Sequence, residues 1–137
     1  APGVPIVAMN YYQPNLALSL VGLADVDEEV AAAALGNSLL EGVYGLFDGV
    51  HVADVQDAFK THKTNGKTPK NVKEICKLTL MCEKDHGDYV LSDWNPVEDG
   101  PQPDIHPSEK GHEKIAKTFE KLIKKHKLID KHKHHTH

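Results

Sequence analysis

Two short apolar runs predict the β-strands of this chain. Residues 4–11 read VPIVAMNY and residues 50–55 read VHVADV, and both are rich in β-branched side chains. Apolar runs of this length are typical of strands covered on both faces, and a proline is tolerated near the start of a strand. We therefore expect two strands that are buried on both faces.

The stretch between the two strands, residues 25–46, predicts a helix. Four acidic residues lie at its start, where the positive end of the helix dipole favours them. Strand, helix and strand in this order predict a right-handed crossover and a parallel sheet. The positions that recur at helical spacing are Val26, Val30, Ala33 or Ala34, Asn37, Leu40, and Val43 or Tyr44.

Two further helices are expected in the second half of the chain. Residues 71–78 indicate one short helix, and a longer helix starts after Pro107, with Ser108 as its N-cap, and fades by about Leu128. Residues 83–103 are rich in Gly, Pro, Asp and Asn, and a loop of that length is usually functional or disordered. The apolar stripe of the last helix is Ile115, Ala116, Phe119, Leu122 and Ile123.

Two parallel strands are too little sheet for a stable α/β domain. We therefore expect the α/β class, with further strands supplied from outside these 137 residues. Residues 1–128 would form one portion of a single domain, and residues 129–137 a tail rich in His and Lys.

Charge and composition argue against several classes of partner. The net charge is −4, yet the residues from Ser108 onward carry nine lysines against four acids. These lysines lie on the polar side of the last predicted helix, so a solvated helix face is favoured over a nucleic-acid site. Arginine is absent from the sequence, which removes bidentate recognition of phosphate. No apolar run reaches the roughly 18 residues of a membrane span, so we expect none.

The two cysteines, Cys76 and Cys82, lie six positions apart. A zinc site would need a second pair nearby, and the sequence has none. A disulfide would contribute about 2–3 kcal/mol and would imply an oxidising compartment, whereas two free buried thiols are the alternative. The histidine-dense tail could bind Zn²⁺, Ni²⁺ or Cu²⁺ adventitiously, but an expression tag or a solvated tail is favoured. We expect neither a metal site nor a cofactor.

A histidine with a restricted backbone is the main candidate for catalysis. His106 precedes Pro107 and the N-cap Ser108, which suits a general base that must hold one orientation. Asp104 could accept the imidazole N–H, set the tautomer and stabilise the imidazolium. Taken alone, the pair is also explained by a capping histidine beside a surface aspartate.

Several segments together resemble the SGNH/GDSL hydrolase superfamily, particularly its secreted esterases and lipases. The match covers residues 1 to about 122, in the order and approximate spacing of the C-terminal half of the family. The segments are residues 2–14 (PGVPIVAMNYYQP), 52–59 (VADVQDAF), 75–82 (ICKLTLMC), 104–107 (DIHP) and 111–112 (GH).

The resemblance implies a three-layer α/β/α flavodoxin-like fold with a parallel sheet, whose N-terminal strands are missing from this chain. It also implies a secreted enzyme that hydrolyses esters through a Ser–His pair. His106 would be the general base and then the acid, and Asp104 its orienting partner. The family's aspartate stands three residues before the histidine, where this chain has Pro103, and some relatives use a backbone carbonyl instead. Cys76 and Cys82 match a disulfide of secreted relatives.

Four further residues are candidates for binding the ester substrate. Asn10, Tyr11 and Tyr12 follow the first strand, at the end of the sheet where α/β proteins bind ligands. Trp94 lies in the loop before His106 and would cover the cleft. Packing roles are the alternative for the aromatic residues.

The nucleophile of the family is absent from this chain. Gly-Asp-Ser and Gly-x-Asn-Asp do not occur, and none of Ser19, Ser38, Ser92 and Ser108 has that context. We expect an N-terminal companion chain of the same enzyme to supply the serine and the oxyanion donors, so that this chain alone is inactive. The alternative is a non-catalytic binding or storage fragment. The sequence leaves the ester unspecified.

Overall fold

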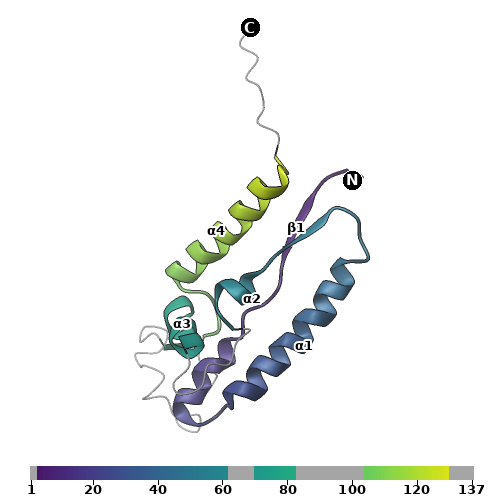
Figure 1. Ribbon diagram of the computed structural model, residues 1–137. Coiled ribbons are helices and arrows are strands. Elements are labelled where there is room, and N and C mark those ends of the chain that lie inside the picture. Colours follow the sequence, from purple (N-terminus) through teal and green to yellow (C-terminus); the bar gives the residue numbers. More distant parts are fainter. Residues whose placement is uncertain (1–2, 62–69, 83–103, 130–137) are drawn as a thin grey trace.

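The computed structural model describes residues 3–61, 70–82 and 104–129. Figure 1 shows α1 and α4 running alongside a pair of strands, with the other helices gathered at the carboxyl end of that pair. In chain order the elements are β1 (Ile6–Met9), the 3₁₀ helix η1 (Pro14–Val21), α1 (Val26–Tyr44), β2 (Val50–Ala53), α2 (Val55–Ala58), α3 (Lys70–Leu78), the 3₁₀ helix η2 (Leu80–Cys82) and α4 (Glu109–His126).

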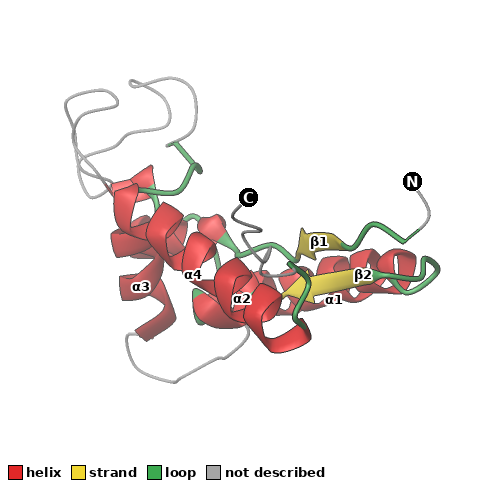
Figure 2. Cartoon of the chain, turned by 90° about the horizontal axis from the view of Figure 1, so that it is seen from above, coloured by secondary structure: helices red, strands yellow, loops and turns green. Residues whose placement is uncertain are grey.

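The two strands form a parallel pair, as the strand–helix–strand order predicts. Ile6 lies opposite Val50, and Met9 lies opposite Ala53. Figure 2 shows the two strands side by side, with α1 running along them. Within the described residues the chain is therefore a mixed α/β structure, mostly helical, with a two-stranded sheet.

The expectation that both strands are buried on both faces is wrong for the described structure. Ile6 is 55% exposed, and the other residues of β1 are half-buried. In β2 only Ala53, at the carboxyl end, is buried. The reason is that the core formed with η1, α2 and α3 lies beyond the carboxyl ends of the strands, whereas only α1 and α4 run along the sheet itself.

The hydrophobic core lies at that carboxyl end. The 3₁₀ helix η1 contributes two fully buried residues, Leu16 and Ala17, although the sequence around Pro14 and Asn15 predicts only a turn there. The core residues are Leu16, Ala17, Val30, Val55, Phe59, Val72, Ile75, Leu78 and Met81.

Helix α1 has the predicted bounds to within two residues. Its N-cap is Asp25, whose side chain accepts a hydrogen bond of 3.0 Å from the backbone N–H of Glu28. Ala33 and Tyr44, rather than Ala34 and Val43, lie on the inner side of the helix. The outer side carries three exposed apolar residues at i, i+4 and i+8, namely Leu35, Leu39 and Val43.

Helix α4 begins after Ser108, as predicted, and packs tightly against the end of α3. The Ser108 hydroxyl oxygen accepts a hydrogen bond of 3.2 Å from the N–H of Gly111. A Cβ atom at Gly111 would clash with the backbone oxygen of Leu78 and would lie 3.0 Å from Cβ of Pro107. Only glycine allows this approach without a shift of one backbone.

The substitution Gly111→Ala tests this contact. Alanine normally favours a helix over glycine by about 1 kcal/mol. At Gly111 the clash with backbone should reverse the sign, and we expect a loss of about 2 kcal/mol in the free energy of unfolding. Urea unfolding followed by circular dichroism measures the change.

Gly36→Ala in α1 is the matched control, because a Cβ there meets no atom within 4 Å. We expect it to stabilise the chain by up to about 1 kcal/mol. Equal effects of the two substitutions would contradict the close approach at Gly111.

Candidate functional site

His106 and Asp104 form a close pair in the segment that leads into α4. The imidazole Nδ1 lies 2.5 Å from Oδ1 of Asp104, and the backbone N–H of His106 donates to the same oxygen at 2.9 Å. The His106 side chain is 77% exposed, and that of Asp104 is 24% exposed. The carboxylate of Asp104, rather than a backbone carbonyl, is therefore the group at Nδ1.

This geometry defines what the pair can do chemically. A carboxylate at Nδ1 favours the tautomer that carries its proton there, which leaves the lone pair of Nε2 to act as a base. The same carboxylate stabilises the imidazolium that forms when Nε2 takes a proton. Because the ring is exposed, Nε2 can act on a group presented by another surface.

The backbone around His106 is paired with the end of α3. The N–H of Leu80 donates to the carbonyl of His106 at 2.9 Å, and the N–H of Ser108 donates to the carbonyl of Leu78 at 2.9 Å. Between them, Thr79 and Pro107 form an antiparallel bridge. The exposed histidine is thus carried on a fixed backbone.

Tyr12 supports the same segment from the other end of the sequence. Its hydroxyl donates to the carbonyl of Ile105 at 2.9 Å, and its ring stacks on Phe59 with centroids 4.5 Å apart. Burial, and then the nearby charge of Asp104, raise the pKa of Tyr12 to about 12. The sequence pointed to Tyr12 for its place after a strand, but it contains no signal for this contact with Ile105.

Asn10 is a buried junction between β1 and two helices. Its Nδ2 donates to Oε1 of Glu41 at 3.1 Å and to Oδ1 of Asp54 at 2.8 Å, while its Oδ1 accepts from the N–H of Gln56 at 2.8 Å. Both amide hydrogens are thus used within the chain. A substrate contact by Asn10 stays a prediction.

Tyr11 and Tyr12 border a hollow on the inner side of α1. The side-chain amide of Asn37 fixes the backbone of Tyr11 through two hydrogen bonds of 2.8 Å, and the Tyr11 side chain is 61% exposed. The hollow measures about 390 Å³, and His106 is not among its lining residues. Its lining residues are Tyr11, Tyr12, Gln13, Ala33, Gly36, Asn37 and Leu40.

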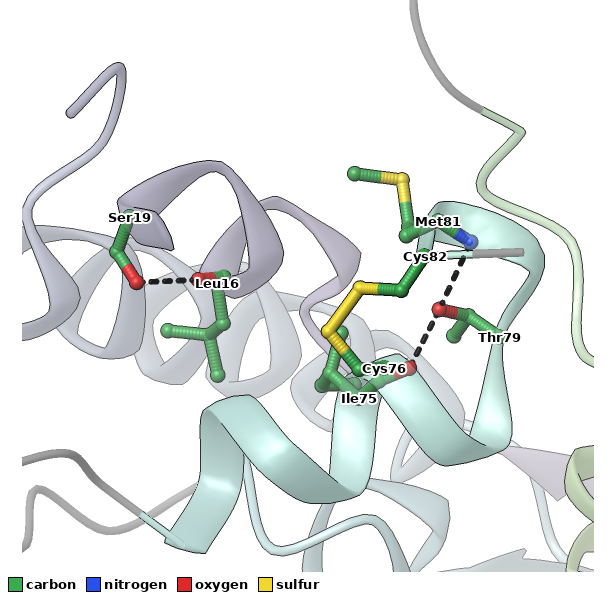
Figure 3. Close-up of a disulfide and its surroundings, with 7 residues drawn as sticks. All are labelled: Leu16, Ser19, Ile75, Cys76, Thr79, Met81 and Cys82. Atoms are coloured by element: carbon green, nitrogen blue, oxygen red, sulfur yellow. Dashed lines mark hydrogen bonds between the residues drawn. A yellow bond between two sulfur atoms is a disulfide. The ribbon is translucent and has the colours of Figure 1, made fainter. Parts of the chain in front are cut away.

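The predicted disulfide is present in the structure. Cys76 and Cys82 are bonded, with their Cα atoms 5.0 Å apart, so the alternative of two free thiols is excluded. Figure 3 shows the disulfide closing the turn that follows α3, next to the side chains of Thr79 and Met81.

The described serines offer no nucleophile to His106. The Ser108 hydroxyl donates to the carbonyl of Lys77 at 2.8 Å while it caps α4, and the Ser19 hydroxyl donates to the carbonyl of Leu16 at 2.7 Å. Ser38 is exposed on α1. Ser92 and the predicted cleft residue Trp94 lie outside the described residues.

The described residues offer no cluster of metal ligands and no membrane-spanning helix. Among residues 3–61, 70–82 and 104–129, no group of three or more His, Cys, Asp and Glu side chains is placed to hold a metal ion. No helix of the same residues combines the length and apolarity needed to cross a membrane. Most of the histidine-rich tail, residues 130–137, lies outside the described part.

Some residues that build the site carry no obvious signal in the sequence. Asn37 and Glu41 sit within an ordinary helical pattern, and Thr79 and Leu80 follow a helix without any motif. Asp54 could have been found, because it directly follows a strand and caps α2 by accepting from the N–H of Asp57 at 3.0 Å.

Comparison with known proteins adds no family assignment. No protein-family model matches the chain, and neither the curated proteins nor the solved structures gave a match. The relation to the SGNH/GDSL hydrolases therefore rests on the residues of the chain and remains a proposal.

The substitution Tyr12→Phe tests the support of the His106 segment. It removes the hydrogen bond to Ile105 but keeps a ring to stack on Phe59, so we expect a loss of about 1 kcal/mol in the free energy of unfolding at neutral pH. In the wild-type chain this stability is present below pH 10 and is lost as the pH rises through the folded pKa of about 12.

Absorbance near 295 nm measures the same tyrosine directly. We expect one phenol of the folded wild-type chain to ionise at about pH 12, and this late step to be missing from Tyr12→Phe. Identical titration curves of the two proteins would contradict the burial and bonding of Tyr12.

Proposed function

We propose that this chain carries the acid–base half of a serine-type ester hydrolase of the SGNH/GDSL kind. The observation that supports the proposal most directly is the Asp104–His106 pair, with its short contact at Nδ1 and its exposed ring. A capping histidine would not need a carboxylate on its ring, because Ser108 already caps α4. The bond at Nδ1 is instead the one that a general base requires.

The chemistry follows from the two nitrogens of the ring. Nε2 of His106 takes the proton of a serine hydroxyl as its oxygen attacks the carbonyl carbon of the ester. The imidazolium, stabilised by Asp104, then gives that proton to the departing alkoxide, which leaves as the alcohol. In the second half Nε2 takes a proton from water as the water oxygen attacks the acyl carbon; the bond from that carbon to the serine oxygen then breaks, the carboxylic acid leaves, and the serine oxygen receives the proton from Nε2. No metal or cofactor is needed for these steps.

The serine and the oxyanion donors are proposed to come from an N-terminal companion segment outside these residues. Within the described chain, β1 pairs only with β2, and further parallel strands beside β1 would complete a three-layer α/β/α sheet. The exposed apolar residues near β1 and on α1 support this, because such surfaces normally face other protein. They are Val4, Ile6, Leu35, Leu39, Val43, Leu46 and Phe47.

Helix α4 supports the same proposal from its own side. An open apolar hollow of about 720 Å³ lies along it, lined mainly by Ile115, Ala116, Phe119, Ile123 and Ile129. An amphipathic helix normally turns such a stripe towards a sheet or another helix. The completed sheet would supply that cover.

Substrate and location complete the proposal. The substrate class is a carboxylic ester. Because the surroundings of His106 are half-exposed, we propose that the companion segment determines which acyl group of the ester is accepted. We propose secretion because a disulfide persists in an oxidising compartment.

A serine-directed fluorophosphonate tests the function. We expect it to label a serine in the native preparation, on a polypeptide that carries Gly-Asp-Ser, and to leave the isolated 137-residue chain unlabelled. Mass spectrometry of the labelled peptide identifies the companion. Absence of both labelling and ester turnover in the native preparation would contradict the proposal and favour a non-catalytic fragment.

Coexpression with the companion then tests His106 itself. We expect His106→Gln to lower ester turnover by about 10²- to 10⁴-fold, the usual contribution of a general base. His112→Gln is the matched control, because His112 is exposed near the start of α4, the helix that follows the His106 segment. Turnover that survives His106→Gln would remove the histidine from the mechanism.

A further inference from the structure

The contacts of His106, Pro107 and Ser108 with the end of α3 and the turn after it fall on four consecutive residues. The carbonyl of His106 accepts from the N–H of Leu80, and Pro107 is bridged to Thr79. The N–H of Ser108 donates to the carbonyl of Leu78, and the Ser108 hydroxyl donates to the carbonyl of Lys77. One short stretch, residues 77–80, therefore fixes the backbone of the segment that carries the histidine.

That stretch lies inside the ring closed by the disulfide. Cys76 and Cys82 are six positions apart, and residues 77–80 occupy four of the five positions between them. The two cysteines are the only ones in the sequence, so no other disulfide within these 137 residues can enclose this stretch. Figure 3 shows the ring with the hydrogen bonds of Thr79 beside it.

Residues within the disulfide ring supply the backbone carbonyls and the N–H group that form hydrogen bonds with the His106 segment. Helix α3 ends at Leu78, so the carbonyls of its last turn have no partner within the helix. The chain then turns into η2, which points the N–H of Leu80 at His106. The disulfide joins Cys76 in the last turn of α3 to Cys82 at the end of η2, and so spans this stretch.

The His106 side chain and backbone otherwise depend on their own segment. The ring and the N–H of His106 both bind Asp104, only two residues away. Among the described residues, the hydrogen bond that ties His106 itself to another element is the one from Leu80. Its neighbour Ile105 has the hydroxyl of Tyr12 as a second support.

We propose that the Cys76–Cys82 disulfide is a positioning element for His106, which makes the placement of the base conditional on oxidised cysteines. The proposal rests on the proposed function for its catalytic meaning. Met81, between the cysteines, is buried in the core and could hold the turn without the crosslink. The experiment must therefore separate the effect of the disulfide from the effect of Met81 packing.

Nuclear magnetic resonance of the 137-residue chain, oxidised and reduced, tests the proposal. Dithiothreitol opens the disulfide by passing two electrons and two protons to the cysteine sulfurs, and it becomes a cyclic disulfide itself. We expect the N–H groups of Leu80 and Ser108 to exchange at least about tenfold faster after reduction, through local opening. The order parameter of the His106 amide should fall from about 0.85 to below about 0.6.

A remote N–H group and the imidazole are the internal controls. The N–H of Gln56, bonded to Asn10 at 2.8 Å, should gain less in exchange rate than those of Leu80 and Ser108, because it lies outside the ring and responds only to the loss of global stability. The neutral His106 imidazole should keep its proton on Nδ1, because Asp104 belongs to the same segment. The Asp104–His106 pair is then still formed, but its position relative to residues 77–80 is no longer fixed.

Two variants separate positioning from stability. The double variant Cys76→Ser/Cys82→Ser should reproduce the reduced state. Val72→Ala removes buried volume from α3 without opening the ring, and should leave the His106 order parameter unchanged.

Two outcomes overturn the proposal. One is unchanged exchange at Leu80 and Ser108 after reduction, which would assign the turn to the packing of Met81. The other is an equal rise at Gln56, which would make the disulfide a general stabiliser of the chain. Neither readout uses ester turnover, so a failure of the proposed function, seen as missing phosphonate labelling, is a separate result.

In the enzyme completed by its companion, reduction of the disulfide should lower kcat and leave KM unchanged. Oxidised glutathione should restore kcat.

Discussion

The described structure depends on one junction, where the end of α3 meets the start of α4. Ser108 joins the two helix ends, because its hydroxyl accepts from Gly111 at the start of α4 and donates to Lys77 in the last turn of α3. Each helix would otherwise leave backbone groups unpaired at this point. The close approach of Gly111 to Leu78 follows from the same contact. His106 lies two residues before Ser108, so its position follows from the hydrogen bonds that pair the backbone groups of these two helix ends.

The two halves of the molecule differ in how far their side chains are buried. Beyond the carboxyl ends of the strands, core side chains such as Leu16, Phe59 and Ile75 are fully buried. Along the strands themselves, Ile6 and the outer face of α1 remain exposed. Asn10 marks the boundary between the halves, since its amide links β1 to carboxylates on α1 and before α2. The exposed half presents apolar surface, and the buried half forms the hydrophobic core.

The two strands and the three longer helices were predictable from the sequence, whereas the short helices η1, α2 and η2 and the connections were not. The bounds of α1 and α4 follow from helical spacing and from the caps Asp25 and Ser108, which are local signals. The Asp104–His106 pair was predictable for the same reason, being only two residues apart. The 3₁₀ helix η1 was missed because its apolar run follows Gln13-Pro14-Asn15, which marks a turn. The bond from Tyr12 to Ile105 could not be predicted, because periodicity carries no information about partners so far apart.

That separation has a consequence for how the site forms. The hydroxyl of Tyr12 and the carbonyl of Ile105 are 93 positions apart in the sequence, the longest span of any side-chain hydrogen bond described. Contacts of such span close the largest loops and form slowly compared with local ones. On a ribosome, the first strand and α1 emerge well before the histidine segment exists. The bond from Tyr12 to Ile105 is therefore expected to close late in folding, after the local contacts of His106 with Asp104 have formed.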